Sequence, residues 1–366
     1  MKNQIVNILI LNWNGWEDTI ECLNSLMAIK YKEFNILVLD NHSSNDSFDR
    51  ISLWAKSKEN KFTFYSEKRL NIKRIITNPS QNLVLLKSKT NLGFAGGNNY
   101  LIMWGNIELP SNLILLLNND TTVDKMFLTI LVKELSTSPL IGAVGPLICN
   151  YFSKNTVDSS GLILDDRGGA IDCNIFPQSE SKQVFGISGC CVLYKTRIVN
   201  EIIQKWGYFF DDLFFLYYED VDLAWRLNFS GYRSIIKRKS IIYHKVSASS
   251  KRFSIFKSFY LMRNRYFILI KYFPLKNIIS MFSNILKKNL DYVLKILFVN
   301  QNSNKHIRSV KKRYPIISLL GLFVKVHASV IYNFPTYLIK RNKFVKTKLV
   351  DLKKFQKVYA IYKKNN

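Results

Sequence analysis

The chain has 366 residues, of which 48% are hydrophobic and 14% aromatic, and this composition excludes a disordered protein. The length predicts one large domain of roughly 250 residues followed by an extension. Most of the net charge of +27 lies in residues 251–366, which hold 26 basic residues against two acidic ones. This basic segment predicts a polyanionic partner: an anionic membrane surface, a lipid-linked phosphate or a nucleic acid.

The first third of the chain alternates short apolar runs with helical patterns. Strands are predicted at residues 5–11, 34–39, 82–86 and 113–117, separated by helices or by the polar spacer around residues 55–80. Apolar strands joined by helical crossovers indicate an α/β fold with a mostly parallel sheet covered by helices on both faces. Such sheets bind ligands at the carboxyl ends of their strands. We interpret the spacer as an insertion without a role in chemistry.

The rest of the chain is less regular until it becomes strongly basic. Strands are expected in GAVGPLI and GISGCCVLY, and two short strands in GYRSIIKRKSIIYH, which ends at His244. Residues 251–366 predict amphipathic helices. Within them, residues 316–334 are the most apolar, but Lys325 and His327 interrupt this run, which favours a helix at a membrane surface over a spanning one.

The cysteines and the N-terminus bear on location. The five cysteines, which include the adjacent pair Cys190 and Cys191, show no metal-binding or redox spacing. Their odd number predicts free thiols in a reducing compartment. The N-terminus lacks the pattern of a secretory signal. We therefore expect a cytoplasmic protein that attaches peripherally to the inner face of the plasma membrane.

Polar clusters follow the predicted strands, at residues 12–14, 40–46, 91–98 and 118–120. Asp120 follows a buried strand, where a carboxylate can hold a divalent cation against a diphosphate, although the same position suits a helix cap. Asp40 can accept a hydrogen bond from the imide of uracil or thymine, or can stabilise its own loop.

The segment NLGFAGGNN, residues 91–99, is rich in glycine. Glycines let the backbone approach a ligand closely and expose N–H donors to phosphate or sugar hydroxyls. The segment matches neither the phosphate loop of nucleotide triphosphatases nor the dinucleotide-binding fingerprint, which argues against an NTPase and a dehydrogenase.

Three carboxylates, Glu219, Asp220 and Asp222, lie among aromatic residues. A partly desolvated carboxylate has a raised pKa and suits the removal of a proton from a hydroxyl. Acids also stabilise the first turn of a helix, but three exceed what a cap requires. His244 is a candidate metal ligand, or a structural histidine.

Taken in order, these segments resemble family 2 glycosyltransferases, particularly the bacterial rhamnosyltransferase-like branch. The resemblance rests on ILILNWNG, ILVLDNHSSNDS, NLGFAGGNN, LLLNNDT and FFLYYEDVDLAWRLNFSGYR with His244, and it continues weakly to RNRYFILIKYFP. It implies a GT-A fold over residues 1–250, with a nucleotide-binding half at 1–122 and an acceptor half at 123–250. It also implies an inverting displacement.

By position, the resemblance assigns roles to individual residues. The donor nucleotide sugar would be bound by Asn12, Asn14, Asp40, Asn91, Gly93, Gly97, Asn98 and Asn118. Asp120 and His244 would hold Mg²⁺ or Mn²⁺, and Asp220 would be the catalytic base, with Glu219 and Asp222 shaping the acceptor pocket. The metal motif departs from the family because it begins with two asparagines and keeps one carboxylate.

Other functions remain to be weighed against this one. A non-catalytic sugar- or nucleotide-binding homologue would share the fold, but the three aspartates Asp40, Asp120 and Asp220 argue against it. A nucleic-acid-binding protein would explain the basic segment, yet no known binding module is present, and we expect no nucleic-acid partner. We expect dTDP-rhamnose or a UDP-sugar as donor, and a lipid-linked saccharide of a surface polysaccharide as acceptor.

Overall fold

The computed structural model describes residues 4–58, 63–66, 80–165, 169–245, 254–297, 315–346 and 352–362. Two expectations lie outside the described residues: the domain boundary at residue 250 and most of the spacer at 55–80. The part of the spacer that is described, Thr63–Ser66, forms a strand at the edge of the sheet, which the sequence did not predict.

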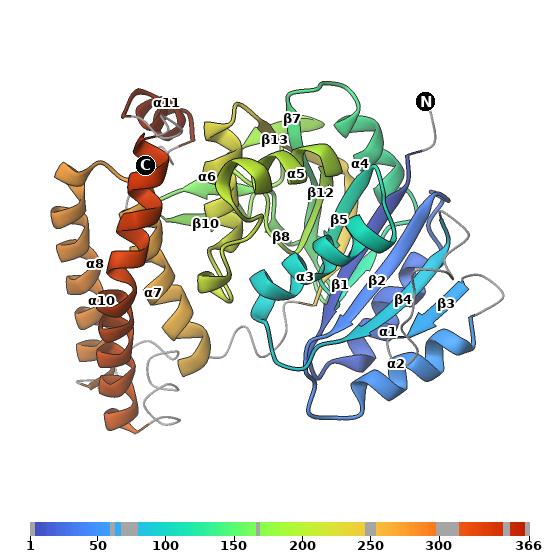
Figure 1. Ribbon diagram of the computed structural model, residues 1–366, viewed down its shortest axis with the longest axis horizontal. Helices are drawn as coiled ribbons and strands as arrows, with labels where there is room; N and C mark the ends of the chain where they lie inside the picture. The colour runs from blue at the N-terminus through green and yellow to red at the C-terminus, as the bar shows by residue number, and fades with distance from the viewer. Residues whose placement is uncertain are drawn as a thin grey trace.

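The nucleotide-binding half is built on parallel strands, which confirms the predicted α/β class (Figure 1). Their order is β5 (Leu113–Leu117), β1 (Val6–Asn12), β2 (Phe34–Asp40), β4 (Asn82–Lys87) and β3 (Thr63–Ser66). Their carboxyl ends therefore share one edge of the sheet, where the predicted polar clusters lie.

The same sheet continues into the second half of the chain. Beyond β5 follow the antiparallel β12 (Cys191–Lys195), then β7 (Ile141–Asn150), β13 (Arg233–His244) and β11 (Ser181–Val184), with β6 (Thr121–Val123) on β13 and β8 (Val157–Ser159) on β7. A separate pair is formed by β9 (Leu162–Leu164) and β10 (Ala170–Asp172). The two short strands expected before His244 are one strand, β13, with a register shift between Lys237 and Ile241.

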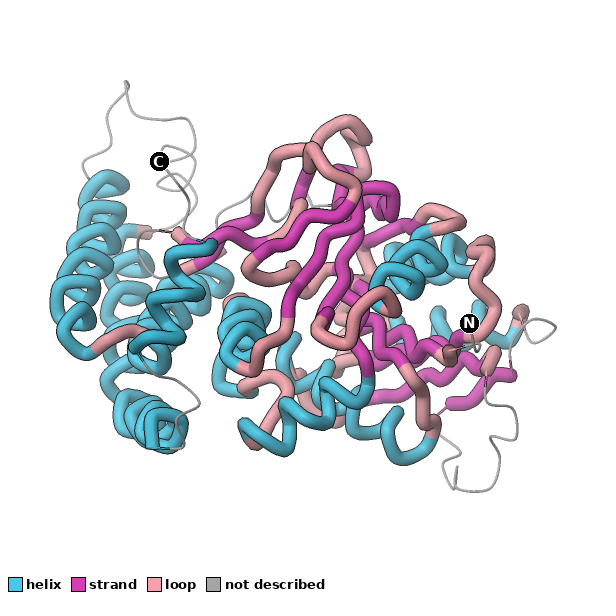
Figure 2. Tube along the Cα trace, turned by 90° about the horizontal axis from the view of Figure 1, so that it is seen from above, coloured by secondary structure: helices cyan, strands magenta, loops and turns pink. Residues whose placement is uncertain are grey.

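Helices cover both faces of the sheet (Figure 2). On β1, Leu9 belongs to one core, whereas its neighbours Ile8 and Ile10 belong to the other, as alternating strand side chains require. The first core includes α3 (Gly93–Glu108), α5 (Thr196–Trp206) and α6 (Glu219–Phe229), and the second includes α1 (Trp16–Leu26), α2 (Ser47–Lys56) and α4 (Phe127–Leu135). This covering explains why the strands read as continuous apolar runs.

The basic C-terminal region forms the helices at one end of the molecule (Figure 1). They are α7 (Ile255–Tyr272), α8 (Leu275–Leu297), α10 (Ile316–Lys346) and α11 (Leu352–Tyr362). Phe267 of α7 is fully buried and stacks on Tyr337 of α10, with 4.0 Å between ring centroids. Both residues also belong to the same hydrophobic core as residues of α3, α5 and α6, so the C-terminal helices pack on that core.

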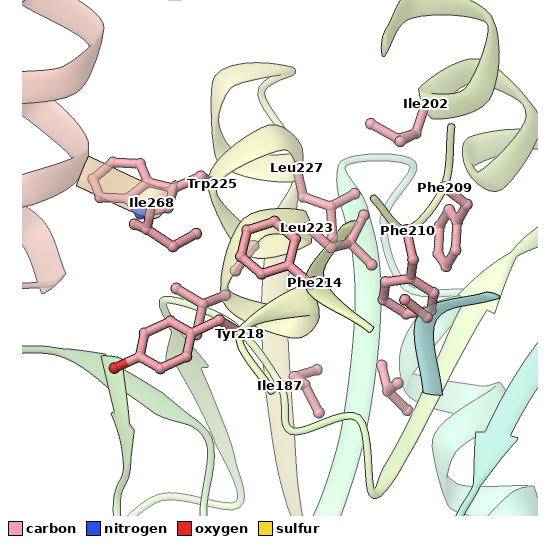
Figure 3. Close-up of a cluster of buried hydrophobic side chains, with 14 of the residues drawn as sticks. Ile187, Ile202, Phe209, Phe210, Phe214, Tyr218, Leu223, Trp225, Leu227 and Ile268 are labelled. Atoms are coloured by element: carbon pink, nitrogen blue, oxygen red, sulfur yellow. The ribbon is translucent and has the colours of Figure 1, made fainter. Parts of the chain in front are cut away.

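A buried network of charges joins α7 to α6. Lys271 of α7 contacts Asp222 of α6, whose second oxygen accepts a hydrogen bond from Arg226 Nε at 2.9 Å. Lys271 Nζ also lies 3.2 Å from Asp211 Oδ2, and Lys340 of α10 binds the other oxygen of Asp211 at 2.7 Å. The elements that carry these charges also contribute hydrophobic side chains to one core, among them Phe214, Trp225 and Ile268 (Figure 3).

Asp222 belongs to this network. Its side chain is fully buried, and both of its oxygens are committed to Lys271, Tyr272 and Arg226. It therefore holds α6 and α7 together, and its expected part in shaping an acceptor pocket stays a prediction.

We predict that Asp222→Asn lowers the free energy of unfolding by about 3–5 kcal/mol, because it leaves the buried Arg226 without its carboxylate and Lys271 with only one of its two. Chemical denaturation with urea measures the change. The exposed Glu17→Gln serves as control and should stay within about 0.5 kcal/mol of the native protein. Equal stability of the two variants would contradict a structural role for Asp222.

Candidate active site

The site begins where β1 and β2 end side by side. The strand register pairs Asn12 with Asp40, and Asn12 Nδ2 donates to Asp40 Oδ2 at 2.8 Å. The other oxygen of Asp40 accepts the amide of Ser43 at 3.0 Å. Asn12 Oδ1 accepts from the hydroxyl of Thr19 at 2.9 Å. Asn12 and Asp40 are buried, so in this structure they fix the two loops that follow them.

Asn14 links the same two loops on the surface. Its backbone takes a left-handed φ of 56°, which asparagine tolerates better than most residues. Its Oδ1 accepts the backbone N–H of Ser44 at 2.8 Å, and its backbone N–H donates to the hydroxyl of Ser43 at 2.9 Å. The polar clusters after β1 and β2 are therefore one hydrogen-bonded unit.

The glycine-rich segment differs from the loop that we expected, because helix α3 begins at Gly93. Gly93 has a φ of +68°, and a Cβ there would lie 2.4 Å from the carbonyl oxygen of Phe215. That oxygen accepts the amides of Phe94 and Ala95, at 2.7 and 3.2 Å. These first amides of the helix bind the chain before the acidic motif and are not free for a ligand.

Two other residues of this segment also serve packing. A Cβ at Gly97 would lie 3.0 Å from the Leu11 side chain, so the glycine lets α3 approach β1. Asn98 is buried and donates to the carbonyl of Phe94 at 3.0 Å. In the structure, Gly97 therefore lets α3 pack against β1, and Asn98 is buried within α3.

Asn41, which the sequence reasoning missed, joins the β2 loop to the glycine-rich segment. Its Oδ1 accepts the amide of Leu92 at 2.9 Å, and its Nδ2 donates to the carbonyl of Gly93 at 3.0 Å and to Asn91 Oδ1 at 3.3 Å. An asparagine beside a conspicuous aspartate carries no separate signal in the sequence. Only the fold shows that it connects three strand ends.

A cavity of about 260 Å³ opens at these strand ends. Of the predicted site residues, Asn91, Gly93, Asn118 and Asp120 line it. The remaining wall is formed by Leu11, Trp13, Asn41, Phe94, Asn119, Phe215, Leu216 and Phe256. Trp13, one of the lining residues, is 56% exposed, so its ring is accessible to a ligand.

Asp120 and His244 lie together because β6 pairs with the end of β13. The antiparallel register sets His244 opposite Thr121, next to Asp120. His244 Nε2 lies 3.3 Å from Asp120 Oδ1, and its Nδ1 lies 2.7 Å from Asp158 Oδ2. The element after Asp120 is strand β6, so Asp120 does not cap a helix.

This arrangement fits a divalent cation. Asp120 Oδ1 is buried and accepts no well-aligned hydrogen bond from the described residues, so it is available as a ligand. Asp158 holds one ring nitrogen of His244 and turns the other towards Asp120, as carboxylates commonly do behind metal-binding histidines. Within the described residues, no group of three or more acidic, histidine or cysteine side chains could bind a metal alone. Further ligands would have to come from substrate phosphate or water.

The carboxylates around His244 favour its protonated form. Burial opposes protonation of His244, but the two neighbouring carboxylates outweigh it and raise its pKa to about 9. A bound cation would have to displace the proton on Nε2, because only a neutral imidazole is a metal ligand. Asp158, which the sequence reasoning missed, is one of these carboxylates. It reaches the site only because β8 pairs with β7, and nothing in the sequence around it indicates that pairing.

Asp220 approaches the same strand ends through the turn before β12. Pairing of Cys191 with Leu117 brings that turn to the end of β5. The amide of Gly189 then donates to Asp220 Oδ2 at 3.2 Å, and the amide of Val221 to Oδ1 at 2.8 Å. Burial raises the pKa of Asp220, although these amides oppose the shift. Such a carboxylate is a stronger proton acceptor than an exposed one.

Glu219 precedes Asp220 at the first position of α6 and is buried. Burial and the charge of Asp220 raise its pKa well above the usual value. Its Oε2 accepts no hydrogen bond from the described residues. Glu219 therefore raises the negative potential near Asp220 whenever it ionises.

The chain before these acids has an unusual backbone. Phe215, Tyr217 and Tyr218 have φ values of 61°, 66° and 72°. Side chains larger than glycine rarely adopt this region, and each such residue costs on the order of 1–3 kcal/mol. Phe215 and Leu216 line the cavity, so the strained segment lies between the cavity wall and Asp220.

The cysteines in the turn before Asp220 have a structural role. Cys190 and Cys191 are both buried, and Cys191 is the first residue of β12. Burial raises the pKa of both thiols well above the usual value, so neither is a reactive thiolate.

The sequence of the chain matches a known protein family. The family model described as glycosyl transferase family 2 matches residues 7–203. The chain belongs to this family. It is therefore a glycosyltransferase, as the ordered motifs indicated.

Two curated relatives and one solved structure are among its matches. The chain is 24% identical over 243 residues to the O-antigen biosynthesis protein RfbC of Myxococcus xanthus, covering 63% of this chain and 16% of the relative. It is 24% identical over 234 residues to the poly-β-1,6-N-acetyl-D-glucosamine synthase of Staphylococcus aureus, covering 62% of this chain and 47% of the relative. The chain thus spans less than half the length of these relatives.

The solved structure shows the fold. It is a mannosyltransferase, PcManGT, from Pyrobaculum calidifontis in complex with GDP-Man and Mn²⁺. Its TM-score is 0.52 at 12% sequence identity, and the match covers 91% of this chain and 88% of that one. The likeness agrees with the GT-A architecture that the sequence predicted.

We predict that Asp120→Ala weakens binding of a nucleoside diphosphate by about tenfold or more when Mg²⁺ or Mn²⁺ is present, because a metal ligand is lost. In EDTA the variant should bind as the native protein does. Calorimetric titration measures both conditions, with the exposed Asp124→Asn as control. A loss of the same size with and without metal would show that Asp120 has a structural role only.

Proposed function

We propose that this glycosyltransferase moves a sugar from a nucleoside-diphosphate donor to a hydroxyl of a saccharide acceptor, with inversion. The observation that carries the proposal is one of position. Asp120, which lies beside His244, lines the cavity, and the turn whose Gly189 amide holds Asp220 is brought to the end of β5 by pairing of Cys191 with Leu117. A cation-holding pair and a base at the same strand ends are what a single displacement requires.

The chemistry assigned to each residue follows from its environment. The acceptor oxygen forms a bond to the anomeric carbon, while the bond from that carbon to the diphosphate oxygen breaks. Asp220 takes the acceptor proton, and the bonding electrons leave with the nucleoside diphosphate. Asp120 and His244 would hold Mg²⁺ or Mn²⁺, which supplies positive charge where the diphosphate departs. The solved mannosyltransferase contains Mn²⁺ with GDP-Man, which supports a metal here.

The nucleoside would lie at the ends of β1 and β2. The loop unit of Asn12, Asn14 and Asp40 gives this end a fixed shape, and Trp13 presents an exposed ring beside it. Aromatic rings bind nucleobases by stacking, which depends little on the base. We propose dTDP-rhamnose as the first donor to test and UDP-hexoses as the next.

A second cavity, of about 510 Å³, gives the acceptor a route to the base. Asp172 and Tyr218 line it on one side, and Leu261, Met262 and Ile285 give it an apolar side. Asp172 lies close enough to Asp220 for their charges to interact. A polar end near the base and an apolar side between α7 and α8 suit a saccharide carried on a lipid. RfbC is by name an O-antigen biosynthesis protein, which supports a surface polysaccharide as product.

We also propose that the C-terminal helices attach the enzyme to the inner face of the plasma membrane. Helix α10 buries Leu322, Val326 and Tyr337 on one face. Its opposite face exposes apolar side chains at intervals of about three, four and seven residues, namely Ile317, Leu320, Val324, Ile331, Ile339 and Val345. Exposed lysines Lys325, Lys343 and Lys346 lie on the same helix.

Residues 317–346 are long and apolar enough to cross a membrane, with a mean hydropathy of 1.5, and no other helix in the described residues is. Polar contacts of the same helix favour a surface position. Lys340 binds Asp211, and Arg341 donates to the carbonyls of Ile270 and Phe273 at 2.9 and 2.7 Å. These contacts hold α10 against the catalytic core along its side, where its free face can meet lipid.

The proposed activity predicts release of a nucleoside diphosphate from a nucleotide sugar, dependent on Mg²⁺ or Mn²⁺ and stimulated by a saccharide acceptor. A screen of dTDP- and UDP-sugars, with EDTA as control, measures it. Asp220→Asn should keep nucleotide binding and lower transfer by roughly 10²-fold or more, because the proton acceptor is lost. A fully active Asp220→Asn would show that another carboxylate is the base.

The proposed attachment predicts that the full chain pellets with anionic vesicles and is released only in part by high salt. Each basic residue near the bilayer contributes about 1 kcal/mol, which salt weakens, whereas buried apolar side chains add a part that salt does not weaken. Val324→Asp combined with Ile331→Asp should remove the salt-resistant part. Leu53→Asp, equally apolar and exposed but on α2, should not change it. Tight RNA binding without vesicle binding would contradict the membrane proposal.

A further inference from the structure

The strained segment before the acidic motif is bound from behind by two adjacent residues of α7. Asn264 is fully buried, and its Nδ2 lies 2.9 Å from the carbonyl of Phe214, 2.9 Å from that of Leu216 and 2.7 Å from that of Tyr217. An amide nitrogen has only two hydrogens, so these three carbonyls share them. The carbonyl of Phe214 also accepts the amide of Leu216 at 2.6 Å, so the carbonyls that depend on Asn264 are those of Leu216 and Tyr217. Loss of a hydrogen bond to a carbonyl in the protein interior is unfavourable.

Arg263 completes the contact. Its Nη2 donates to the carbonyls of Leu213 and Phe214, at 2.5 and 3.2 Å, and its Nε donates to Asn264 Oδ1 at 2.9 Å. Arg263 thereby fixes which way the Asn264 amide points. The guanidinium is largely buried and contacts aromatic rings, including those of Phe259 and Phe267. Burial of a cation away from carboxylates is unfavourable, and the hydrogen bonds from Arg263 to these carbonyls offset part of that cost.

The far side of the same segment is bound by α3. The carbonyl of Phe215 accepts the amides of Phe94 and Ala95, and Gly93 leaves space for it. The segment is therefore held between α7 and the first turn of α3. One of its ends leads into Glu219 and Asp220, and its middle lines the cavity.

We propose that Arg263 and Asn264 are positioning residues for the transfer reaction. They bind no substrate, but hold residues 213–218 in the strained backbone that lines the cavity at Phe215 and Leu216 and leads into Asp220. This proposal rests on the proposed function, because it takes Asp220 as the base. Both residues lie in RNRYF, residues 263–267, to which the sequence assigned no role.

The test is Asn264→Asp, which keeps the shape of the side chain but replaces its donors by acceptors that face three carbonyls. We expect kcat to fall by about tenfold to a hundredfold, since small misplacements of a catalytic group have effects of this size. Binding of dTDP or UDP should weaken less than kcat falls, because the loops after β1 and β2 are held by their own hydrogen bonds, although Phe215 and Leu216 line the same cavity. Arg263→Lys should retain more activity than Arg263→Met, and this pair carries the test if Asn264→Asp does not fold.

A matched control separates positioning from stability. Ile268→Ala alters an equally buried residue of α7 that makes no hydrogen bond to the segment. It should lower the unfolding temperature while the kcat of the folded protein stays native. If Asn264→Asp lowers kcat no more than Ile268→Ala does at equal unfolding temperature, the two residues are structural only and the proposal is overturned.

Amide hydrogen exchange gives a readout that needs no activity. In Asn264→Asp, exchange should become about tenfold faster or more at residues 215–221 and at the first turn of α3, and Ile268→Ala should not show this local pattern. Unchanged exchange in the segment would overturn the proposal whatever the donor screen finds. If Asp220→Asn is inactive while Asn264→Asp keeps native kcat, positioning fails but the proposed function stands. If no donor is cleaved by the native protein, the function fails, and exchange alone decides whether the segment is held by α7.

Discussion

The architecture of the active site depends on the burial of the Lys271 charge. An isolated ammonium group in a protein core costs several kcal/mol, so it is tolerated only beside carboxylates. Lys271 has two, Asp222 on α6 and Asp211 in the preceding segment, and Arg226 and Lys340 complete the network. Because Lys271 and Lys340 lie on α7 and α10 while their carboxylates lie on α6 and in the segment before it, the pairing of these charges fixes α7 and α10 against the segment that carries the acids.

That network explains how a strained backbone persists beside the cavity. Asp211 and Asp222 flank the segment with the left-handed residues Phe215, Tyr217 and Tyr218. Both flanks are anchored by ion pairs, and the carbonyls between them bind Asn264 and α3. The segment cannot relax without breaking buried charge pairs, so local strain is offset by interactions at some distance along the chain. The C-terminal helices are in this sense part of the active site, although they are also the most basic part of the molecule.

The sequence predicted those features that follow from local pattern and strand order. Apolar runs located β1, β2, β4 and β5, and the rule on strand ends placed Asp40 and Asp120 at one edge of the sheet. The resemblance assigned the base to Asp220 and the acceptor pocket to Asp222, but the pattern could not show the buried partners of either acid. Asp222 meets Lys271, which is 49 residues away, whereas Asp220 meets a backbone amide in the turn before β12.

Contacts of this long range account for the other differences. Asp158 enters through pairing of β8 with β7, and the amides of α3 bind Phe215 where a ligand was expected. The strand β3 was missed because a short edge strand in a polar stretch has no apolar periodicity to reveal it. In each case the residue type was visible, but its partner was not.

The distribution of charge around the cavity has a consequence for donor binding. Asp120 and Asp158 flank His244 and raise its pKa, and burial raises the pKa of Glu219 and Asp220, which favours the neutral form of both acids. The buried cations behind the acidic motif, Lys271 and Arg226, pair with Asp222. In the proposed mechanism, the charge of a nucleoside diphosphate is therefore balanced by the cation that Asp120 and His244 would hold. With only one carboxylate and one histidine to hold that cation, the diphosphate must complete its coordination, so in the proposed mechanism metal and donor bind as one unit and each strengthens the binding of the other.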